Sequence, residues 1–91
     1  MQEIVLDFTG CKYYMKLYDI IQEGFKFPEW YGRNLDATWD LLRYYDGPPV
    51  DIKIKGIGTM PKDVQDYMEN ILEVFADVHD EVPQMHFEIL S

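Results

Sequence analysis

Short β-branched segments alternate in this chain with longer segments of helical periodicity, and this alternation most restricts the possible folds. Glu3–Phe8, Val50–Gly56 and Met85–Leu90 have the composition expected of strands. Because helical segments lie between consecutive strands, each strand can return to the sheet in the direction of the previous one. The pattern therefore predicts an α/β fold, in which a small parallel three-stranded sheet packs against about three to four helices.

Each helical segment carries one apolar stripe, as expected of a helix packed on a core. The first helix is expected over Lys12–Gly24, where Gly24 would end it. Asn34 is the expected N-cap of the second, and the third is expected over Pro61–Asp80. The expected buried positions are Tyr14, Leu17, Tyr18 and Ile21 in the first helix, Leu35, Trp39 and Leu42 in the second, and Val64, Met68, Ile71, Phe75 and Val78 in the third.

The size and composition of the chain limit its organisation. With 91 residues, of which 47% are hydrophobic, the chain is expected to form a single domain, residues 1–91, around one modest core. Its only cysteine, Cys11, cannot form an internal disulfide, which fits a reducing compartment. The N-terminus lacks the features of a signal peptide, and no apolar run approaches the roughly 20 residues of a membrane span. We therefore expect a cytoplasmic protein that does not associate with membranes.

The charge balance indicates the chemistry of a partner. Seventeen acidic residues against eight basic ones give a formal net charge of −9. Such a chain repels nucleic acids and anionic membranes and attracts a basic partner, such as a protein that itself binds nucleic acid. A requirement for solubility alone would also produce an acidic surface.

Side chains that could perform catalysis or bind a metal are few. His79 and His86 are the only histidines, and neither accompanies a recognisable nucleophile motif. Cys11 is expected to be a small buried hydrophobic residue. Asp36 and Asp40 could bind a hard cation, but the sequence offers no evident third ligand. We therefore expect no catalytic residues, no metal and no cofactor.

The segment from Phe27 to Leu42 combines large aromatic residues with two aspartates. Asp36 and Asp40 are four residues apart on the solvated side of the expected helix, where like charges repel each other. Acids near a helix N-terminus would explain the aspartates alone. Aromatic residues beside clustered charges are more typical of a protein-binding surface. A second acidic stripe on the last helix contains Asp66, Asn70, Glu73, Asp77 and Asp80.

The run from Pro28 to Asp40 reads Pro-Glu-Trp-Tyr-Gly-Arg-Asn-Leu-Asp-Ala-Thr-Trp-Asp. It resembles the barstar family of intracellular ribonuclease inhibitors, and the length, the element order and the C-terminal Ile-Leu-Ser also fit. The resemblance implies a protein that is monomeric when free and blocks the active site of a basic microbial ribonuclease in a one-to-one complex. That nuclease would be a secreted enzyme or a toxin domain, from which the inhibitor protects the producing cell.

The resemblance also implies roles for individual residues. Asp40 would take the place of the substrate phosphate, Asp36 would meet another cation at the rim, and Trp30 would cover the catalytic face. Arg33 departs from the family pattern because it adds a positive charge to a loop that should approach a basic protein. The remaining implied contact residues are Gly32, Asn34, Leu35, Ala37, Trp39, Tyr44, Tyr45, Val74 and Asp77.

Two other functions remain compatible with the sequence. The chain could be an acidic interaction or immunity protein for a toxin that is not a ribonuclease, or a mimic of nucleic acid that binds a nucleic-acid-binding protein. A ribonuclease inhibitor should block RNA cleavage stoichiometrically, whereas a mimic should compete with nucleic acid for binding.

Overall fold

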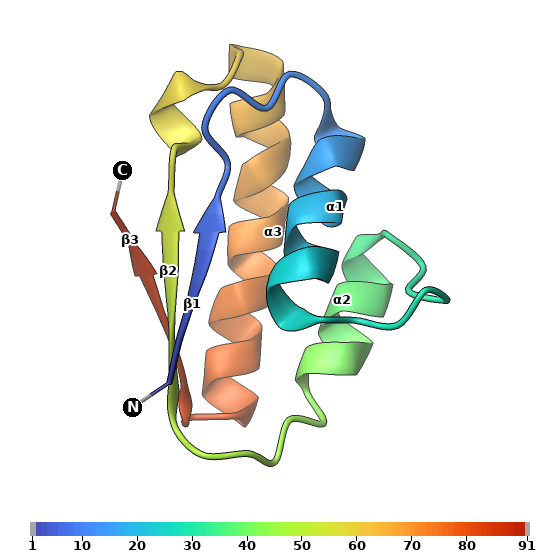
Figure 1. The fold of residues 1–91 in the computed structure, drawn as a ribbon, viewed down its shortest axis with the longest axis vertical. Helices are drawn as coiled ribbons and strands as arrows, with labels where there is room; N and C mark the ends of the chain where they lie inside the picture. Colours follow the sequence, from blue (N-terminus) through green and yellow to red (C-terminus); the bar gives the residue numbers. More distant parts are fainter. Residues whose placement is uncertain (1, 91) are drawn as a thin grey trace.

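Three parallel strands form one sheet, in the order β1-β2-β3, in a computed structural model that describes residues 2–90. The elements are β1 (Gln2–Asp7), α1 (Tyr14–Phe25), α2 (Leu35–Leu42), β2 (Val50–Lys55), the 3-10 helix η1 (Ile57–Thr59), α3 (Lys62–Glu81) and β3 (Met85–Ile89). All three α-helices lie on the same face of the sheet (Figure 1). Because the strand order follows the chain order, right-handed crossovers place both connections on that face. The predicted α/β architecture is confirmed.

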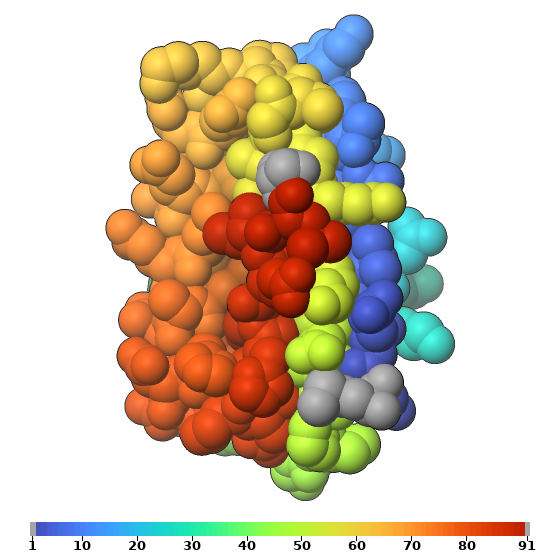
Figure 2. All heavy atoms as spheres, turned by 90° about the vertical axis from the view of Figure 1, so that its left-hand side faces the viewer, coloured from blue at the N-terminus to red at the C-terminus, as the bar shows by residue number. Residues whose placement is uncertain are grey.

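The two faces of the sheet differ in chemistry. Leu6 of β1 pairs in register with Ile54 of β2, and both are fully buried beneath the helices. Figure 2 looks onto the opposite face, where the three strands themselves form the surface. On this face Lys53 donates a hydrogen bond to Glu88 of the neighbouring strand at 2.9 Å, which raises the pKa of the lysine. Parallel sheets are usually covered by helices on both faces. In this sheet one face is open, and charged side chains such as Lys53 and Glu88 allow it to contact water.

The ends of α1 differ from the prediction. Gly24 does not end the helix, because the C-cap is Lys26, whose φ of 57° lies in the left-handed region. Gly24 instead lies where α1 meets the sheet, and a Cβ atom there would be 2.3 Å from Cδ2 of Leu6. At the N-terminus, Tyr14 was expected in the core but is 52% exposed, with its ring centroid 4.9 Å from that of Tyr67. The first turn of α1 therefore extends beyond the core, and its last turn packs closely on β1.

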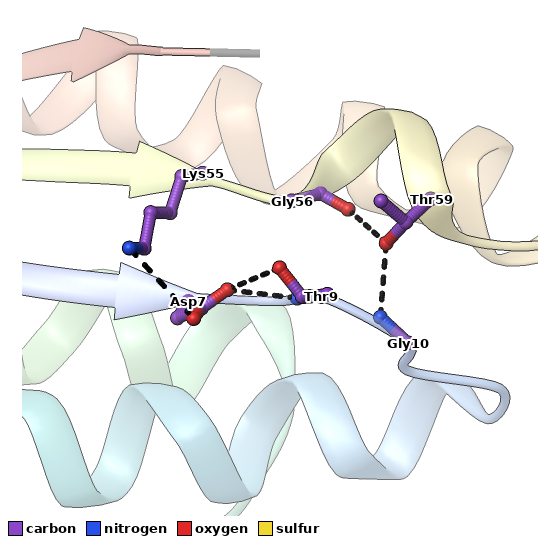
Figure 3. Close-up of polar contacts among 6 residues, drawn as sticks. All are labelled: Asp7, Thr9, Gly10, Lys55, Gly56 and Thr59. Carbon is purple, nitrogen blue, oxygen red and sulfur yellow. Dashed lines mark hydrogen bonds and ion pairs between the residues drawn. The ribbon is translucent and has the colours of Figure 1, made fainter.

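The loops at the carboxyl ends of β1 and β2 are bonded to each other (Figure 3). Oδ1 of Asp7 accepts hydrogen bonds from the backbone N–H, at 3.0 Å, and the hydroxyl of Thr9. The hydroxyl of Thr59 accepts from the N–H of Gly10 at 2.9 Å and donates to the carbonyl of Gly56 at 2.7 Å. Gly56 has a φ of 85°, and a Cβ atom there would lie 2.3 Å from the backbone nitrogen of Thr9. This close approach requires glycine.

The core lies between the sheet and α1 and α3. The five positions predicted to be buried in the last helix, Val64, Met68, Ile71, Phe75 and Val78, are all buried in α3. Cys11 is buried as expected, and burial raises the pKa of its thiol. None of the helices in residues 2–90 combines the length and the hydropathy that a membrane span requires.

Candidate functional site

The turn that precedes α2 buries one aromatic residue and exposes the aromatic residue immediately before it. Tyr31 is only 4% exposed, and its hydroxyl forms a hydrogen bond with the hydroxyl of Thr38 on α2. Burial raises the pKa of Tyr31. The N–H of Tyr31 also donates to the carbonyl of Pro28 at 3.0 Å, which closes the turn. Trp30 lies between Pro28 and Tyr31 in the sequence and is 74% exposed, although large aromatic residues usually bury most of their surface.

Arg33 turns its positive charge toward α1. Its φ of 52° lies in the left-handed region, which is uncommon for a residue other than glycine and costs about 1–2 kcal/mol. Nη1 lies 2.8 Å from Oδ1 of Asp19, an ion pair, and Nη2 donates to Oε1 of Gln22 at 3.0 Å. The positive charge expected in this loop is therefore already partnered within the chain.

Asn34 begins α2 as predicted. Its side-chain oxygen accepts a hydrogen bond from the N–H of Ala37 at 2.7 Å, the geometry of an N-cap. Gly32 lies close to both residues, because a Cβ atom at Gly32 would be 3.2 Å from Cβ of Ala37 and 3.2 Å from Nδ2 of Asn34. The path of the loop into α2 is therefore narrowly defined.

The buried side of α2 is rotated relative to the prediction. Leu42 is buried as expected, but Leu35 and Trp39 are only half-buried at the edge of the core. Thr38 takes the central position and is fully buried. This polar residue can lie there because its hydroxyl donates to the backbone carbonyl of the N-cap residue at 2.8 Å and also bonds Tyr31. Trp39 consequently lies closer to the protein surface than the helical wheel predicts.

The C-terminal end of α2 carries a small group of aromatic side chains around a cation. The guanidinium of Arg43 lies 5.8 Å from the ring centre of Trp39 and 4.9 Å from that of Tyr44. Tyr44 is 72% exposed, whereas Tyr45 is half-buried and its hydroxyl donates to the carbonyl of Pro48. Of the two tyrosines, Tyr44 therefore offers the more accessible ring to a partner.

Asp36 and Asp40 are both exposed on α2. Within residues 2–90 neither carboxylate has a hydrogen bond or an ion pair, although four other acidic side chains on the chain are paired with cations. Arg43, three residues after Asp40, is held against aromatic rings instead. The helix thus presents two unneutralised negative charges one turn apart, which suits the binding of a cationic surface.

The C-terminal half of α3 lies close to α2. The two helices are in direct contact, and Figure 1 places α2 level with this half of α3. Glu73 and Asp77 are exposed there, and Val74 is half-buried against the core. The fold therefore allows both helices to contribute acidic side chains to one partner surface.

The two histidines lie next to each other where α3 meets β3. Nδ1 of His79 donates to the carbonyl of Met85 at 2.7 Å, so it bonds the first residue of β3 rather than a carbonyl of its own helix. The ring of His86 lies 5.5 Å from that of His79. In residues 2–90, no three His, Cys, Asp or Glu side chains are arranged to hold a metal ion.

Comparison with known proteins identifies the family. The sequence profile of the family Barstar, described as barnase inhibitor, matches residues 1–90. The chain belongs to the barstar family. It is also similar to YrdF of Bacillus subtilis (strain 168), which is named as a ribonuclease inhibitor. The two sequences are 29% identical over 82 residues, and the match covers 90% of each chain. The resemblance carried by Pro28–Asp40 is thereby confirmed, and this barstar-family motif contains the anchored Tyr31 next to the exposed Trp30.

Three polar residues that hold the loop and α2 in place were not predicted. Asp19 and Gln22 lie on α1 and contact Arg33, and Thr38 lies under the loop. Thr38 follows the N-cap residue by four positions, a spacing at which threonine often bonds the helix backbone. No comparable local signal distinguishes Asp19 or Gln22, because their partners belong to a distant loop.

Proposed function

We propose that this chain is an intracellular inhibitor of a basic microbial ribonuclease and protects the cell that produces the nuclease. The observations that carry the proposal are an exposed tryptophan, Trp30, in the loop that leads into α2, and two exposed aspartates of α2, Asp36 and Asp40, that lack partners within the described chain. The family description as barnase inhibitor and the name of the Bacillus subtilis relative support it.

The inhibitor acts by occupying the place of the substrate. A ribonuclease active site contains cations that hold the RNA phosphate, and a carboxylate can replace this phosphate as their counter-ion. Asp40 performs this role, Asp36 meets a cation at the rim, and Trp30 covers the catalytic face. The repulsion between the two aspartates is relieved when the cations of the nuclease approach. Further contact residues are Gly32, Asn34, Leu35, Ala37, Trp39, Tyr44 and Tyr45.

The overall charge assists capture of the nuclease. A net charge of −9 attracts a basic protein over a distance and raises the rate of productive encounters. Asp77, with Val74 beside it, extends the acidic surface from α2 onto α3. The same charge disfavours binding to nucleic acids and anionic membranes.

The remaining properties follow from this role. The chain is not an enzyme, is monomeric when free, and binds one nuclease molecule in the cytoplasm. Its interface with the nuclease requires neither a metal nor a cofactor, since carboxylates and aromatic rings provide the contacts.

Titration against a ribonuclease tests the proposal directly. Barnase, the nuclease named in the description of the family, is the first probe, and a basic protein captured from the source organism is the second. We expect RNA cleavage to fall linearly with added inhibitor and to stop at one equivalent. Capture of a basic partner whose RNA cleavage is unaffected, or that cuts no RNA, would support an acidic immunity or interaction protein for another toxin or a nucleic-acid-binding protein instead.

A further inference from the structure

Both ends of the loop that presents Trp30 are held by one side chain of α1. Nε2 of Gln22 donates to the carbonyl of Pro28 at 2.9 Å, at the start of the loop. Oε1 of Gln22 accepts from Nη2 of Arg33 at 3.0 Å, at the end of the loop. Gln22 therefore uses its amide oxygen and its amide nitrogen to connect two points that are five residues apart in the sequence.

The carbonyl of Pro28 joins this connection to the turn that contains the tryptophan. It accepts one hydrogen bond from Gln22 and another from the N–H of Tyr31 at 3.0 Å. Trp30 lies between these two bonded positions in the sequence. A change in the position of the Pro28 carbonyl would therefore redirect the exposed ring of Trp30.

Arg33 completes the connection at the other end. Its backbone adopts the left-handed conformation, and its guanidinium reaches back to Gln22 and to the carboxylate of Asp19, 2.8 Å away. Arginine suits this position because its planar group can bind two acceptors at once. The side chains of Arg33 and Asp19 are 43% and 40% exposed, so solvent screens part of this ion pair, and the hydrogen bonds of Gln22 provide the more directional part of the connection.

We propose that Asp19, Gln22 and Arg33 form a clamp that holds the Trp30 turn in the conformation that binds the nuclease. Arg33 is then a positioning residue for inhibition, and it contacts α1 rather than the partner. The inference rests on the proposed function, because it concerns how the same surface is organised before binding. A turn that is already in its binding conformation avoids the loss of affinity that arises when only a fraction of the molecules can bind.

The clamp and a simple charge effect predict opposite results for the same variant. If Arg33 acted only through its positive charge, removing that charge would reduce repulsion from a basic nuclease and strengthen binding. If Arg33 acts through the clamp, Arg33→Gln should weaken binding because the turn becomes mobile. Glutamine and arginine have a similar energetic cost in the left-handed region, so backbone strain does not differ between the parent and Arg33→Gln.

The first measurement uses the free protein and needs no nuclease. Hydrogen exchange of the Tyr31 amide reports the bond to Pro28 that closes the turn. We expect Arg33→Gln and Gln22→Met each to accelerate this exchange at least tenfold and to leave the amides of β2 unchanged. Lys16→Gln, which removes the same charge from an exposed position of α1 away from the loop, should leave the Tyr31 amide unchanged. Unchanged exchange in both clamp variants would overturn the proposal.

The second measurement is the inhibition constant against barnase. We expect each single clamp variant to raise it about tenfold, and the double variant Arg33→Gln/Gln22→Met to raise it no further, because both changes release the same turn. Tighter inhibition by Arg33→Gln would overturn the clamp in favour of the charge effect. If the parent protein does not inhibit barnase, the proposed function fails for that nuclease, and the exchange rates of the free protein still decide the clamp.

Discussion

Substitution of Asp40 by asparagine separates binding from folding. Asp40 is exposed in the last turn of an eight-residue helix, four residues after Asp36. Its negative charge is unfavourable next to the C-terminal end of the helix dipole, and it repels Asp36 by about 0.2–0.5 kcal/mol. Asp40→Asn removes both effects and keeps the shape of the side chain. We therefore expect the free protein to gain about 0.5 kcal/mol of stability, which raises its Tm by about 2–4 °C.

The expected effect on binding has the opposite sign and is much larger. If Asp40 replaces a substrate phosphate, the asparagine leaves a cluster of nuclease cations buried without a counter-ion. Loss of one partner from such a pair costs on the order of 4 kcal/mol, which corresponds to roughly a thousandfold rise in the inhibition constant. Asp40→Ala should have a similar effect, because the charge rather than the hydrogen-bonding shape provides the contact.

The assay combines the inhibition constant against RNA cleavage with a thermal melt of each variant. Asp66→Asn is the matched control, since it changes the net charge equally but lies on α3 next to Lys62, with which it pairs at 3.1 Å. We expect the control to change the inhibition constant less than threefold. An Asp40→Asn variant that folds normally and inhibits within tenfold of the parent would refute the phosphate-mimic mechanism and the placement of the site on α2.

Four further predictions concern the overall charge, the acidic residues of α3 and the fold. Raising salt from low to physiological concentration should slow association about tenfold in stopped-flow measurements and leave dissociation nearly unchanged, and a salt-independent association rate would exclude steering. By calorimetry, Asp77→Ala should weaken binding by about 1–3 kcal/mol and Glu73→Ala by less than about 1 kcal/mol, whereas equal losses would mean that α3 contributes only a general field. Gly56→Ala should lower the free energy of unfolding in urea by roughly 2–4 kcal/mol, because Gly56 has a φ of 85° and lies against the backbone of Thr9. Gly58→Ala is the control and should lower it by less than about 1 kcal/mol, since the space around Gly58 is open. The pKa of Asp7 is lowered by hydrogen bonds from Thr9. The stabilisation that Asp7 provides is therefore present above the pKa of this group in the unfolded chain and is lost as the pH falls through its lower pKa in the folded protein. Urea unfolding between about pH 2 and 6 should show this loss of stability in the parent and a smaller loss in Asp7→Asn.

The sequence by itself determined the features that depend on neighbours along the chain. Apolar periodicity predicted the five buried positions of α3, and the alternation of strands and helices predicted a parallel sheet, since both patterns reflect which side chains can reach a common core. The N-cap at Asn34 was also predictable, because its bond to Ala37 spans only three residues. The motif from Pro28 to Asp40 predicted the family for the same reason, as it is continuous in the chain.

Tertiary structure decided the features that depend on contacts between distant segments. Gly24 appeared to end a helix, but its role is to let α1 approach Leu6 of the sheet, which no pattern within the helix records. The helical wheel of α2 placed Trp39 in the core, whereas Thr38, bonded to the hydroxyl of Tyr31, is buried there together with Leu42. Arg33 is the clearest case. Its charge is visible in the sequence, but whether that charge faces a partner or an internal carboxylate depends on how α1 and the loop pack, because electrostatic pairing is decided by distance in space rather than by position in the chain.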